Sequence, residues 1–348
     1  DTLSLHDALP ISALMAYRLA THVASPLVPM LLRRRVRAGR EDAFRLNERV
    51  ARHLPARAPG RLVWCHGASV GETRLLLGLG QRLLARHPDL CLLLTCQTQT
   101  AAALLAAQDQ LVCQRQMAPV DTPAIAARFV AHWRPDLAVF AEGEIWPNLL
   151  EALRAKGTPT ALVNARMTDR SLKGWGRVPA MARRLFGGFD ILLAAAPATG
   201  AGLEALAGRA VTVSGNLKPA LPPPPADADA VARLARDYVA GRQCLVAAST
   251  HPGEEALLVE AWRSLTPRPA LILAPRHPER GDALAEWLRQ TGLSVVERSR
   301  EGEAVPDADA ILLADTMGEM GMWYRLADLV YLGGGHAADV GGHNPLEP

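Results

Sequence analysis

The sequence predicts an α/β protein with two doubly wound, Rossmann-like domains. Short apolar runs alternate with helical stretches along most of the 348 residues. The proline-rich stretch 219–226 interrupts this alternation once, and a second βα series starts after it. Hydrophobic residues make up 49% of the chain and charged residues 21%, so the chain can bury a large core. We therefore expect a first domain at residues 41–218, a linker at 219–226 and a second domain at 227–348.

The two ends of the chain depart from this pattern. Residues 1–12 resemble a translated sequencing-adaptor remnant and are left out of the fold prediction. Residues 13–40 are apolar at first and end in a cluster of arginines, and Arg18 and two prolines interrupt the apolar part. This predicts a membrane-associated basic segment rather than a clean membrane-spanning helix, although an ordinary surface helix fits equally well. The sequence stops at Pro348 inside a motif, so we expect the second domain to be incomplete.

The elements of the first domain follow from its apolar runs. Buried strands are expected at residues 62–64, 91–95, 137–140, 160–163, 191–194 and 211–213. Helices are expected from Glu72 onward and at residues 100–107, 123–132 and 146–156. In the second domain, the same reasoning predicts strands at 244–247, 270–273, 311–313 and 329–332, and helices at 253–264 and 280–291.

The stretch at residues 61–77 is the most informative part of the first domain. Its apolar start predicts a strand, Gly67 and Gly71 permit a sharp turn, and leucines at helical spacing follow. In a doubly wound sheet, such a corner faces the crevice beyond the carboxyl ends of the strands, where ligands bind. Glu72 is therefore a candidate functional carboxylate. An acid at this position can also serve only to complement the helix dipole.

Other predicted strands also end in polar groups. In the first domain these are Glu142 with Glu144, Asn164 with Arg166, and Lys218. In the second domain, hydroxyl and N–H groups at residues 249–253 suit a phosphate, although a helix cap explains them equally well. Further polar or glycine-rich strand ends follow at Arg276, residues 315–319, 333–336 and 341–347. Acidic and basic groups at successive strand ends indicate an anionic ligand in a cleft.

Several classes of protein are not supported. A formal net charge of +3 is too small to indicate nucleic-acid binding. The sequence has neither a P-loop nor a dinucleotide-binding glycine motif. Its five cysteines lack a zinc-binding spacing and predict reduced residues in or beside the core, and no carboxylate or cysteine spacing supports a metal at the glycine-rich histidines.

Eight segments together resemble one family, the 3-deoxy-D-manno-octulosonic acid (Kdo) transferases of lipopolysaccharide synthesis. In order, they are ASVGE, EGEIWPNL, LVNARMTDRS, GNLK, ASTHPGEE, APRHPER, DTMGEM and GGHNPLEP. The resemblance runs from about Leu62 to the end of the chain. It implies a GT-B glycosyltransferase with two Rossmann-like domains facing a cleft, at the cytoplasmic face of the inner membrane. It also implies an inverting transfer of Kdo from CMP-Kdo to lipid IVA, without metal or other cofactor.

The resemblance also assigns roles to individual residues. Glu72 matches the catalytic base of the family, and Glu142 and Lys218 match positions that stabilise the transition state. The matches to the CMP-binding segments are Pro275, Arg276, Met317, Gly318, Glu319, Asn344, Pro345, Leu346 and Glu347.

The sequence departs from the family pattern in places, for example at Gly143 and Gly335. Two alternatives stay open: another GT-B transferase that uses a UDP-sugar, and a truncated binding module without turnover.

Overall fold

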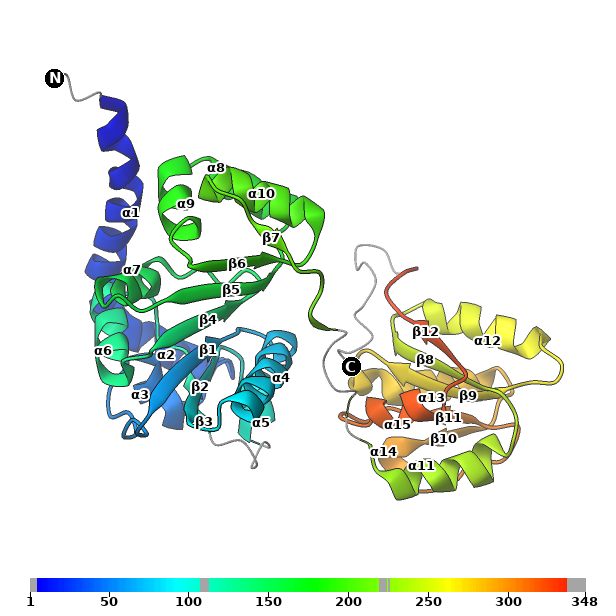
Figure 1. Cartoon of the computed structure of the whole chain (residues 1–348). Coiled ribbons are helices and arrows are strands. Elements are labelled where there is room, and N and C mark those ends of the chain that lie inside the picture. The colour runs from blue at the N-terminus through cyan, green and yellow to red at the C-terminus, as the bar shows by residue number, and fades with distance from the viewer. Residues whose placement is uncertain (1–4, 107–112, 219–223, 225, 337–348) are drawn as a thin grey trace. The chain divides into compact units, whose positions relative to one another are not determined.

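The computed structural model describes residues 5–106, 113–218, 224 and 226–336 (Figure 1). The chain divides into two compact units, Asp1–Leu221 and Pro222–Pro348, called unit 1 and unit 2. Each unit contains one parallel sheet covered by helices on both faces. Within the described ranges, no helix combines the length and apolar character that crossing a bilayer requires.

Unit 1 is built on a seven-stranded parallel sheet with the order β3-β2-β1-β4-β5-β6-β7. The strands are β1 (Arg61–His66), β2 (Leu90–Cys96), β3 (Cys113–Met117), β4 (Leu137–Ala141), β5 (Thr160–Ala165), β6 (Ile191–Ala194) and β7 (Thr212–Val213). The strand order reverses between β1 and β4, and in doubly wound folds ligands bind at this point. The confirmed strand runs place Glu72, Glu142 and Lys218 after the carboxyl ends of strands.

Alternating side chains of the strands build two cores in unit 1. Leu62 and Trp64 of β1 belong to one core, and Val63 and Cys65 belong to the other. Residues of α4 (Val70–Arg86) and α5 (Gln99–Ala106) complete the second core. The first core takes residues from α1 (Leu5–Ala24), α2 (Val28–Arg37), α6 (Pro123–Trp133), α7 (Pro147–Ala155), α9 (Pro179–Phe186) and α10 (Pro197–Ala207). Helix α8 (Asp169–Gly176) packs beside α9 and α10.

Helix α1 is attached to the start of α7 by a buried carboxylate. The Tyr17 hydroxyl donates to Asp121 at 2.9 Å, and the backbone N–H groups of Asn148 and Leu149 donate to the same carboxylate. The Asn148 amide also donates to the Thr21 hydroxyl at 3.1 Å. These contacts hold the middle of α1 against the first turn of α7.

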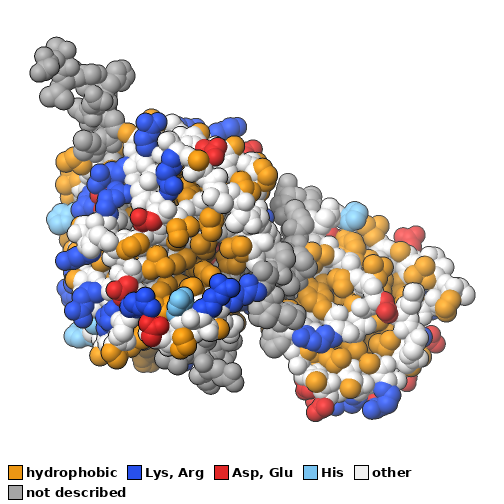
Figure 2. All heavy atoms as spheres, in the orientation of Figure 1, with side chains coloured by type: hydrophobic (Ala, Val, Ile, Leu, Met, Phe, Trp, Pro, Cys, Tyr) orange, Lys and Arg blue, Asp and Glu red, His pale blue; other side chains and the backbone are white. Residues whose placement is uncertain are grey.

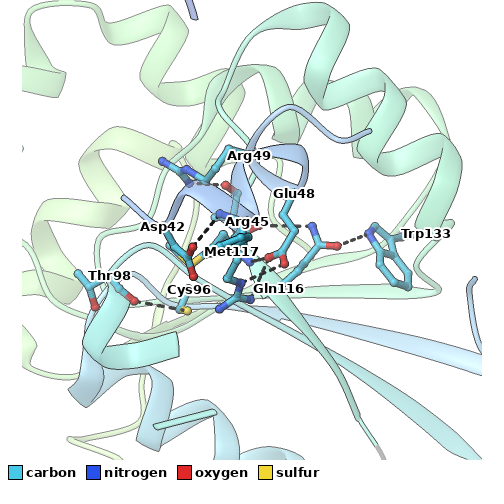
Figure 3. Close-up of polar contacts among 11 residues, drawn as sticks. Asp42, Arg45, Glu48, Arg49, Cys96, Thr98, Gln116, Met117 and Trp133 are labelled. Atoms are coloured by element: carbon cyan, nitrogen blue, oxygen red, sulfur yellow. Dashed lines mark hydrogen bonds and ion pairs between the residues drawn. The ribbon is translucent and has the colours of Figure 1, made fainter. Parts of the chain in front are cut away.

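A second polar network covers one end of the sheet (Figure 3). Glu48 of α3 (Leu46–Arg49) pairs with Arg45 and accepts a hydrogen bond from the N–H of Met117 in β3. Arg49 donates to the carbonyl of Ala118. These bonds hold α3 against the carboxyl end of β3. Side chains of the protein itself therefore cover this end of the strand.

Unit 2 has a five-stranded parallel sheet with the order β10-β11-β9-β8-β12. The strands are β8 (Cys244–Thr250), β9 (Ala270–Pro275), β10 (Val295–Glu297), β11 (Ile311–Leu313) and β12 (Leu329–Leu332). Helices α11 (Ala228–Leu234) and α15 (Met320–Leu326) cover one face, and α12 (Glu254–Ser264) and α13 (Gly281–Gln290) cover the other. A short helix, α14 (Arg298–Glu301), follows β10. The strand order reverses between β8 and β12.

The structure confirms the predicted strands and helices of both units, with ends shifted by a few residues, and adds elements that the sequence did not predict. These include β3, β10 and the helices α8 to α11. Cys91, Cys96 and Cys244 form no disulfide bond, as predicted, and neither does Cys65.

Candidate active site

The candidate catalytic residues of unit 1 meet at the carboxyl ends of β1, β4 and β5. Lys218 forms an ion pair with Glu142, with 2.9 Å between Nζ and Oε1. Glu72 lies near enough to the carboxylates of Glu144 and Glu142 for their charges to act on it. The structure thus brings together the three residues predicted from separate segments, and it adds Glu144 to the group.

The turn between β1 and α4 holds Glu72 in one position. Ser69 caps α4 by accepting a hydrogen bond from the N–H of Glu72. The Glu72 carboxylate in turn accepts hydrogen bonds from the N–H of Ala68 at 2.5 Å and the Ser69 hydroxyl at 3.1 Å. A Cβ at Gly67 would lie 2.8 Å from that of Glu72, so only glycine leaves room for this packing. Glu72 is therefore part of the hydrogen-bonded start of α4, in addition to placing a negative charge at the N-terminus of the helix.

Capping does not account for the electrostatics of Glu72. Its side chain is buried, and burial is the largest cause of a raised pKa. The negative charges of Glu144 and Glu142 raise the pKa further, whereas the hydrogen bonds from Ala68 and Ser69 lower it. The net effect is a carboxylate that binds a proton more readily than an ordinary glutamate. Such a group is suited to accept a proton from a ligand.

Glu142 and Asn164 adopt strained backbone conformations beside Lys218. Their φ angles are 54° and 51°, in the left-handed region that residues other than glycine rarely enter. The Asn164 amide donates to Glu142 at 3.3 Å, and its carbonyl oxygen accepts from the N–H of Leu217 at 2.9 Å. Asn164 therefore connects the ends of β4 and β5 to the segment that carries Lys218. Strain of this kind is concentrated at functional sites.

Glu144 is a further carboxylate of the site, to which the sequence analysis assigned no role of its own. Trp146 donates to it at 2.9 Å, and His66 and Gln97 contact it at 3.3 Å each. Burial by itself raises the pKa of Glu144, but the interactions with His66 and the hydrogen bonds from Trp146 and Gln97 outweigh burial and hold its pKa below the ordinary value. The negative charge of Glu144 adds to burial, the largest cause, in raising the pKa of Glu72. The only sequence signal for it is the pair of acids in EGE.

In unit 2, the predicted CMP-binding residues lie at the ends of β9 and β11. Pro275 ends β9, and the N–H of the next residue, Arg276, donates to the carbonyl of Thr250 at 3.0 Å. Met317 is 72% exposed, and a Cβ at Gly318 would meet nothing within 4 Å. These residues leave space for a ligand beside the strand ends. The Glu319 carboxylate is less available to a ligand, because Arg298 and Thr316 already bind it.

The Glu319 carboxylate is already bound by the protein. Arg298 pairs with it at 2.7 Å, and the Thr316 hydroxyl donates to it. The Arg298 guanidinium also lies over the ring of Trp323, 5.9 Å from its centre. Glu319 therefore holds the turn 316–319 in shape, and the remaining predicted residues Asn344, Pro345, Leu346 and Glu347 lie outside the described residues.

A buried carboxylate that the sequence analysis did not assign, Glu254, organises the centre of unit 2. It accepts hydrogen bonds from the N–H groups of His251 at 2.8 Å, Gly334 at 2.9 Å and His336 at 3.1 Å. The Tyr331 hydroxyl donates to it at 3.0 Å. Burial by itself raises the pKa of Glu254, but these bonds outweigh burial and keep its pKa below the ordinary value. Glu254 thus connects the glycine-rich turn after β12 to the start of α12, where the strand order reverses. The expected cap by Ser249 or Thr250 is wrong, because α12 begins after Gly253 and no side chain caps it.

Among the described residues, no three histidine, cysteine, aspartate or glutamate side chains are grouped so that they could hold a metal ion.

Comparison with known proteins identifies a family. A profile described as 3-Deoxy-D-manno-octulosonic-acid transferase (kdotransferase) matches residues 44–221. The 3-deoxy-D-manno-octulosonic acid transferase of Bordetella pertussis is 38% identical over 351 residues, covering 95% of this chain and 79% of the relative. The transferase of the same name from Rickettsia bellii is 28% identical, covering 95% of this chain and 79% of the relative.

A solved structure supports the fold. A glycosyltransferase from Rickettsia africae is 11% identical, with a TM-score of 0.50, and the match covers 78% of this chain and 73% of that one. Together with the two parallel-sheet units, this likeness confirms the predicted GT-B fold class.

Proposed function

The chain belongs to the 3-deoxy-D-manno-octulosonic acid (Kdo) transferase family and is therefore a glycosyltransferase, and from this premise we propose that it transfers Kdo from CMP-Kdo to the lipid A precursor lipid IVA with inversion at the anomeric carbon. Unit 1 binds the acceptor and supplies Glu72, and unit 2 binds the nucleotide. The environment of Glu72, a buried carboxylate with a raised pKa at the point where the strand order reverses, is the observation that carries this proposal.

Glu72 acts as the general base of the reaction. An acceptor hydroxyl attacks the anomeric carbon of Kdo, and Glu72 takes its proton as the new C–O bond forms. The bond from the anomeric carbon to the phosphate oxygen breaks on the opposite side, and its electron pair leaves with CMP. A single displacement of this kind inverts the anomeric centre. The hydrogen bonds from Ala68 and Ser69 orient the carboxylate for this role.

Lys218 provides positive charge while the bond to the donor breaks. Its ammonium group is buried and held by Glu142, so its position is set before the ligand arrives. Arg276 of unit 2 provides a guanidinium for the phosphate of CMP, Pro275, Met317 and Gly318 contact the rest of the nucleotide, and Glu319 holds the turn that carries them. The family resemblance gives Asn344, Pro345, Leu346 and Glu347 a role in CMP binding as well.

The N-terminal helices attach the enzyme to the cytoplasmic face of the inner membrane. Large hydrophobic side chains of α1, of α2 and of the turn between them are exposed, and we call this set the apolar stripe: Met15, Leu19, Val23, Leu27, Met30 and Leu31. Exposed arginines follow it at positions 33, 34 and 37. In Figure 2, hydrophobic side chains of unit 1 lie exposed among arginine and lysine side chains. Apolar contact plus about 1 kcal/mol for each basic residue near anionic lipid supports binding at the membrane surface.

Point substitutions test membrane binding better than a deletion, because Leu14, Val28 and Leu32 of the same helices belong to the core. We expect Leu19→Ser with Val23→Ser to weaken sedimentation with vesicles that contain phosphatidylglycerol about tenfold or more. Leu257→Ser removes an equally exposed leucine from unit 2 and serves as the control. Equal binding by all three proteins would contradict the proposal.

Product analysis tests the reaction itself. The full chain is incubated with CMP-Kdo and lipid IVA, and the lipid product and CMP are quantified. We expect equal amounts of Kdo-modified lipid and CMP, with the anomeric configuration opposite to that of the donor. A UDP-sugar in place of CMP-Kdo is the control for donor class. Transfer from the UDP-sugar alone, or nucleotide binding without transfer from either donor, would overturn the proposal in favour of another transferase or a binding module.

A further inference from the structure

A groove of about 850 Å³ lies in unit 1 on the side of α7 that faces α1 and α9. Ligand-binding pockets in proteins have volumes of about 300–1,000 Å³, so this space is large enough for a ligand. Most of the described side chains that line it are apolar, and several are small. They include Leu14, Met15, Ala127, Ala152, Ala155 and Ala180. The groove is thus largely apolar, and it stays open because larger side chains in place of the alanines would fill it.

The charged residues of the groove favour an anion. Arg18, Arg183 and Arg184 line it, together with one carboxylate, that of Glu151. Glu151 is already paired with Arg184 at 2.6 Å and with Arg154. The single acid is therefore neutralised within the protein, and the remaining charge at the groove is positive.

One buried polar atom of a lining residue has no partner among the described residues. Asn148 lines the groove and is 1% exposed, and its amide nitrogen donates to Thr21 and to the carbonyl of Asp121. Its carbonyl oxygen Oδ1 is buried and accepts no hydrogen bond from the described residues. Buried acceptors are rarely left unpaired, so this oxygen calls for a donor on a ligand. An O–H or N–H group on an otherwise apolar chain in the groove would supply such a donor.

One lining residue of the groove follows the catalytic cluster closely in the chain, and another belongs to the apolar stripe. Asn148 is two residues from Trp146, whose indole donates to Glu144 at 2.9 Å. Met15 belongs to both the groove lining and the apolar stripe. An amphiphile taken from a membrane surface could therefore place its chain in the groove and its polar part near Glu144 and Glu72.

From the volume, the arginines, the unpaired Oδ1 of Asn148 and this position, we infer that the groove binds one fatty-acyl chain of the lipid acceptor. An anionic group of the acceptor contacts the arginines, and a hydroxyl or amide N–H on the chain donates to Asn148. The inference rests on the proposed function for the identity of the acceptor. The apolar groove then makes the enzyme selective for an acylated acceptor over the bare sugar.

Filling the groove tests the inference. Ala127 and Ala155 line the groove and are both exposed. Ala127→Leu and Ala155→Leu therefore fill part of the groove with a larger side chain without disturbing the core. We expect each to raise KM for lipid IVA about tenfold, the effect of excluding about two methylene groups. The kcat, the KM for CMP-Kdo and the KM for a chemically deacylated acceptor stay unchanged. Ala124→Leu, at an exposed position of α6 outside the groove, is the matched control.

The outcomes separate failure of the inference from failure of the proposed function. An unchanged KM for lipid IVA, or an equal rise with the deacylated acceptor, overturns the inference while transfer continues. If the wild-type chain transfers no Kdo, the proposed function fails, and labelling by a fatty acid with a terminal diazirine decides the inference. We expect labelled peptides from α7 and α9, with less labelling in Ala127→Leu than in Ala124→Leu. Equal labelling overturns the inference, as does loss of binding to acceptor-free phospholipid vesicles in the filled variants.

Discussion

The carboxyl ends of the two parallel sheets differ in how their acidic side chains are satisfied. In unit 2, Glu254 accepts four hydrogen bonds from the protein, and Glu319 is paired with Arg298 and Thr316. Their pKa values lie below the ordinary value despite burial. In unit 1, Glu72 is buried beside two other carboxylates, and its pKa is raised. The same strand-end position thus carries a stabilised acid in one unit and a destabilised one in the other.

This difference separates the chemical roles of the two sheets. A carboxylate whose bonds come from its own protein keeps its charge and holds loops in place, and it has little tendency to take a proton. A carboxylate that burial and neighbouring charge make less stable is a better base. We therefore expect proton transfer to depend on unit 1 and nucleotide binding to depend on unit 2.

The largest effect is expected for Glu72→Gln. Loss of the proposed general base should lower kcat by about 10²–10⁴-fold, whereas the affinity for CMP should stay unchanged because the nucleotide site is proposed to lie in unit 2. Steady-state transfer assays with titration calorimetry of CMP measure both. Glu72→Asp, which keeps a carboxylate but shortens its reach, should retain more activity than the Gln variant. Near-normal kcat for Glu72→Gln would remove Glu72 from the mechanism.

Arg276→Ala is expected to show the opposite pattern. Hydrogen bonds to a charged group are worth about 1.5–3 kcal/mol, so CMP affinity should fall about 10- to 100-fold. Calorimetry with CMP measures this change, and cytidine without phosphate is the control ligand, since its weaker binding should be equal in both proteins. An unchanged affinity for CMP would exclude Arg276 as a phosphate contact.

Glu254→Gln tests whether an internal anion organises the nucleotide site. The amide keeps the size of the side chain but turns one acceptor atom into a donor that faces N–H groups, among them those of His251 and Gly334. We expect CMP affinity to fall by less than about tenfold, with faster amide hydrogen exchange at residues 333–336. Glu260→Gln, on the same helix and exposed, is the control. Unchanged exchange would mean that the glycine-rich turn holds its shape without Glu254.

The sequence was sufficient to predict the buried strands, but it did not predict β3 and β10. Both are edge strands, paired on one side only. Their sequences, CQRQM and VVE, contain polar residues and no continuous apolar run. Edge position alone does not explain the misses, because the edge strands β7 and β12 were predicted from their apolar residues. Three of the five residues of β3 are polar, and β10 has only two apolar residues.

The site was predictable only in part, for a related reason. Glu72, Glu142 and Lys218 were found because each follows a strand, which is a local signal. The roles of Glu144 and Glu254 depend on partners far along the chain: His66 is 78 residues from Glu144, and Gly334 is 80 residues from Glu254. Nothing local in the sequence says which of these groups meet, so the difference between a stabilised and a destabilised acid appears only in the folded protein.

The smallest effect is expected on the free energy of unfolding, whose pH dependence should differ between Glu72 and Glu254. A group whose pKa is raised in the folded state binds fewer protons when unfolded, so the free energy of unfolding falls as the pH rises from the ordinary pKa through the raised one. The pKa of Glu72 is raised, so Glu72 lowers the free energy of unfolding as the pH rises, and Glu72→Gln removes this decrease. Glu254 has the opposite sign: its folded pKa is lowered, so it stabilises the protein above the ordinary pKa, and this stability is lost as the pH falls through the folded pKa.

Denaturant unfolding measured from about pH 4 to 8 therefore distinguishes Glu72 from Glu254. Relative to wild type, Glu72→Gln should be equally or more stable at neutral pH, and this difference should disappear at low pH. Glu254→Gln should be less stable at neutral pH and approach wild type at low pH. If Glu72 served only as a helix cap, its Gln variant would instead lose about 0.3–1 kcal/mol at neutral pH through the helix dipole. A stable but inactive Glu72→Gln variant would show that the carboxylate is retained for proton transfer at the expense of stability, because a purely structural acid would not be kept where it destabilises the fold.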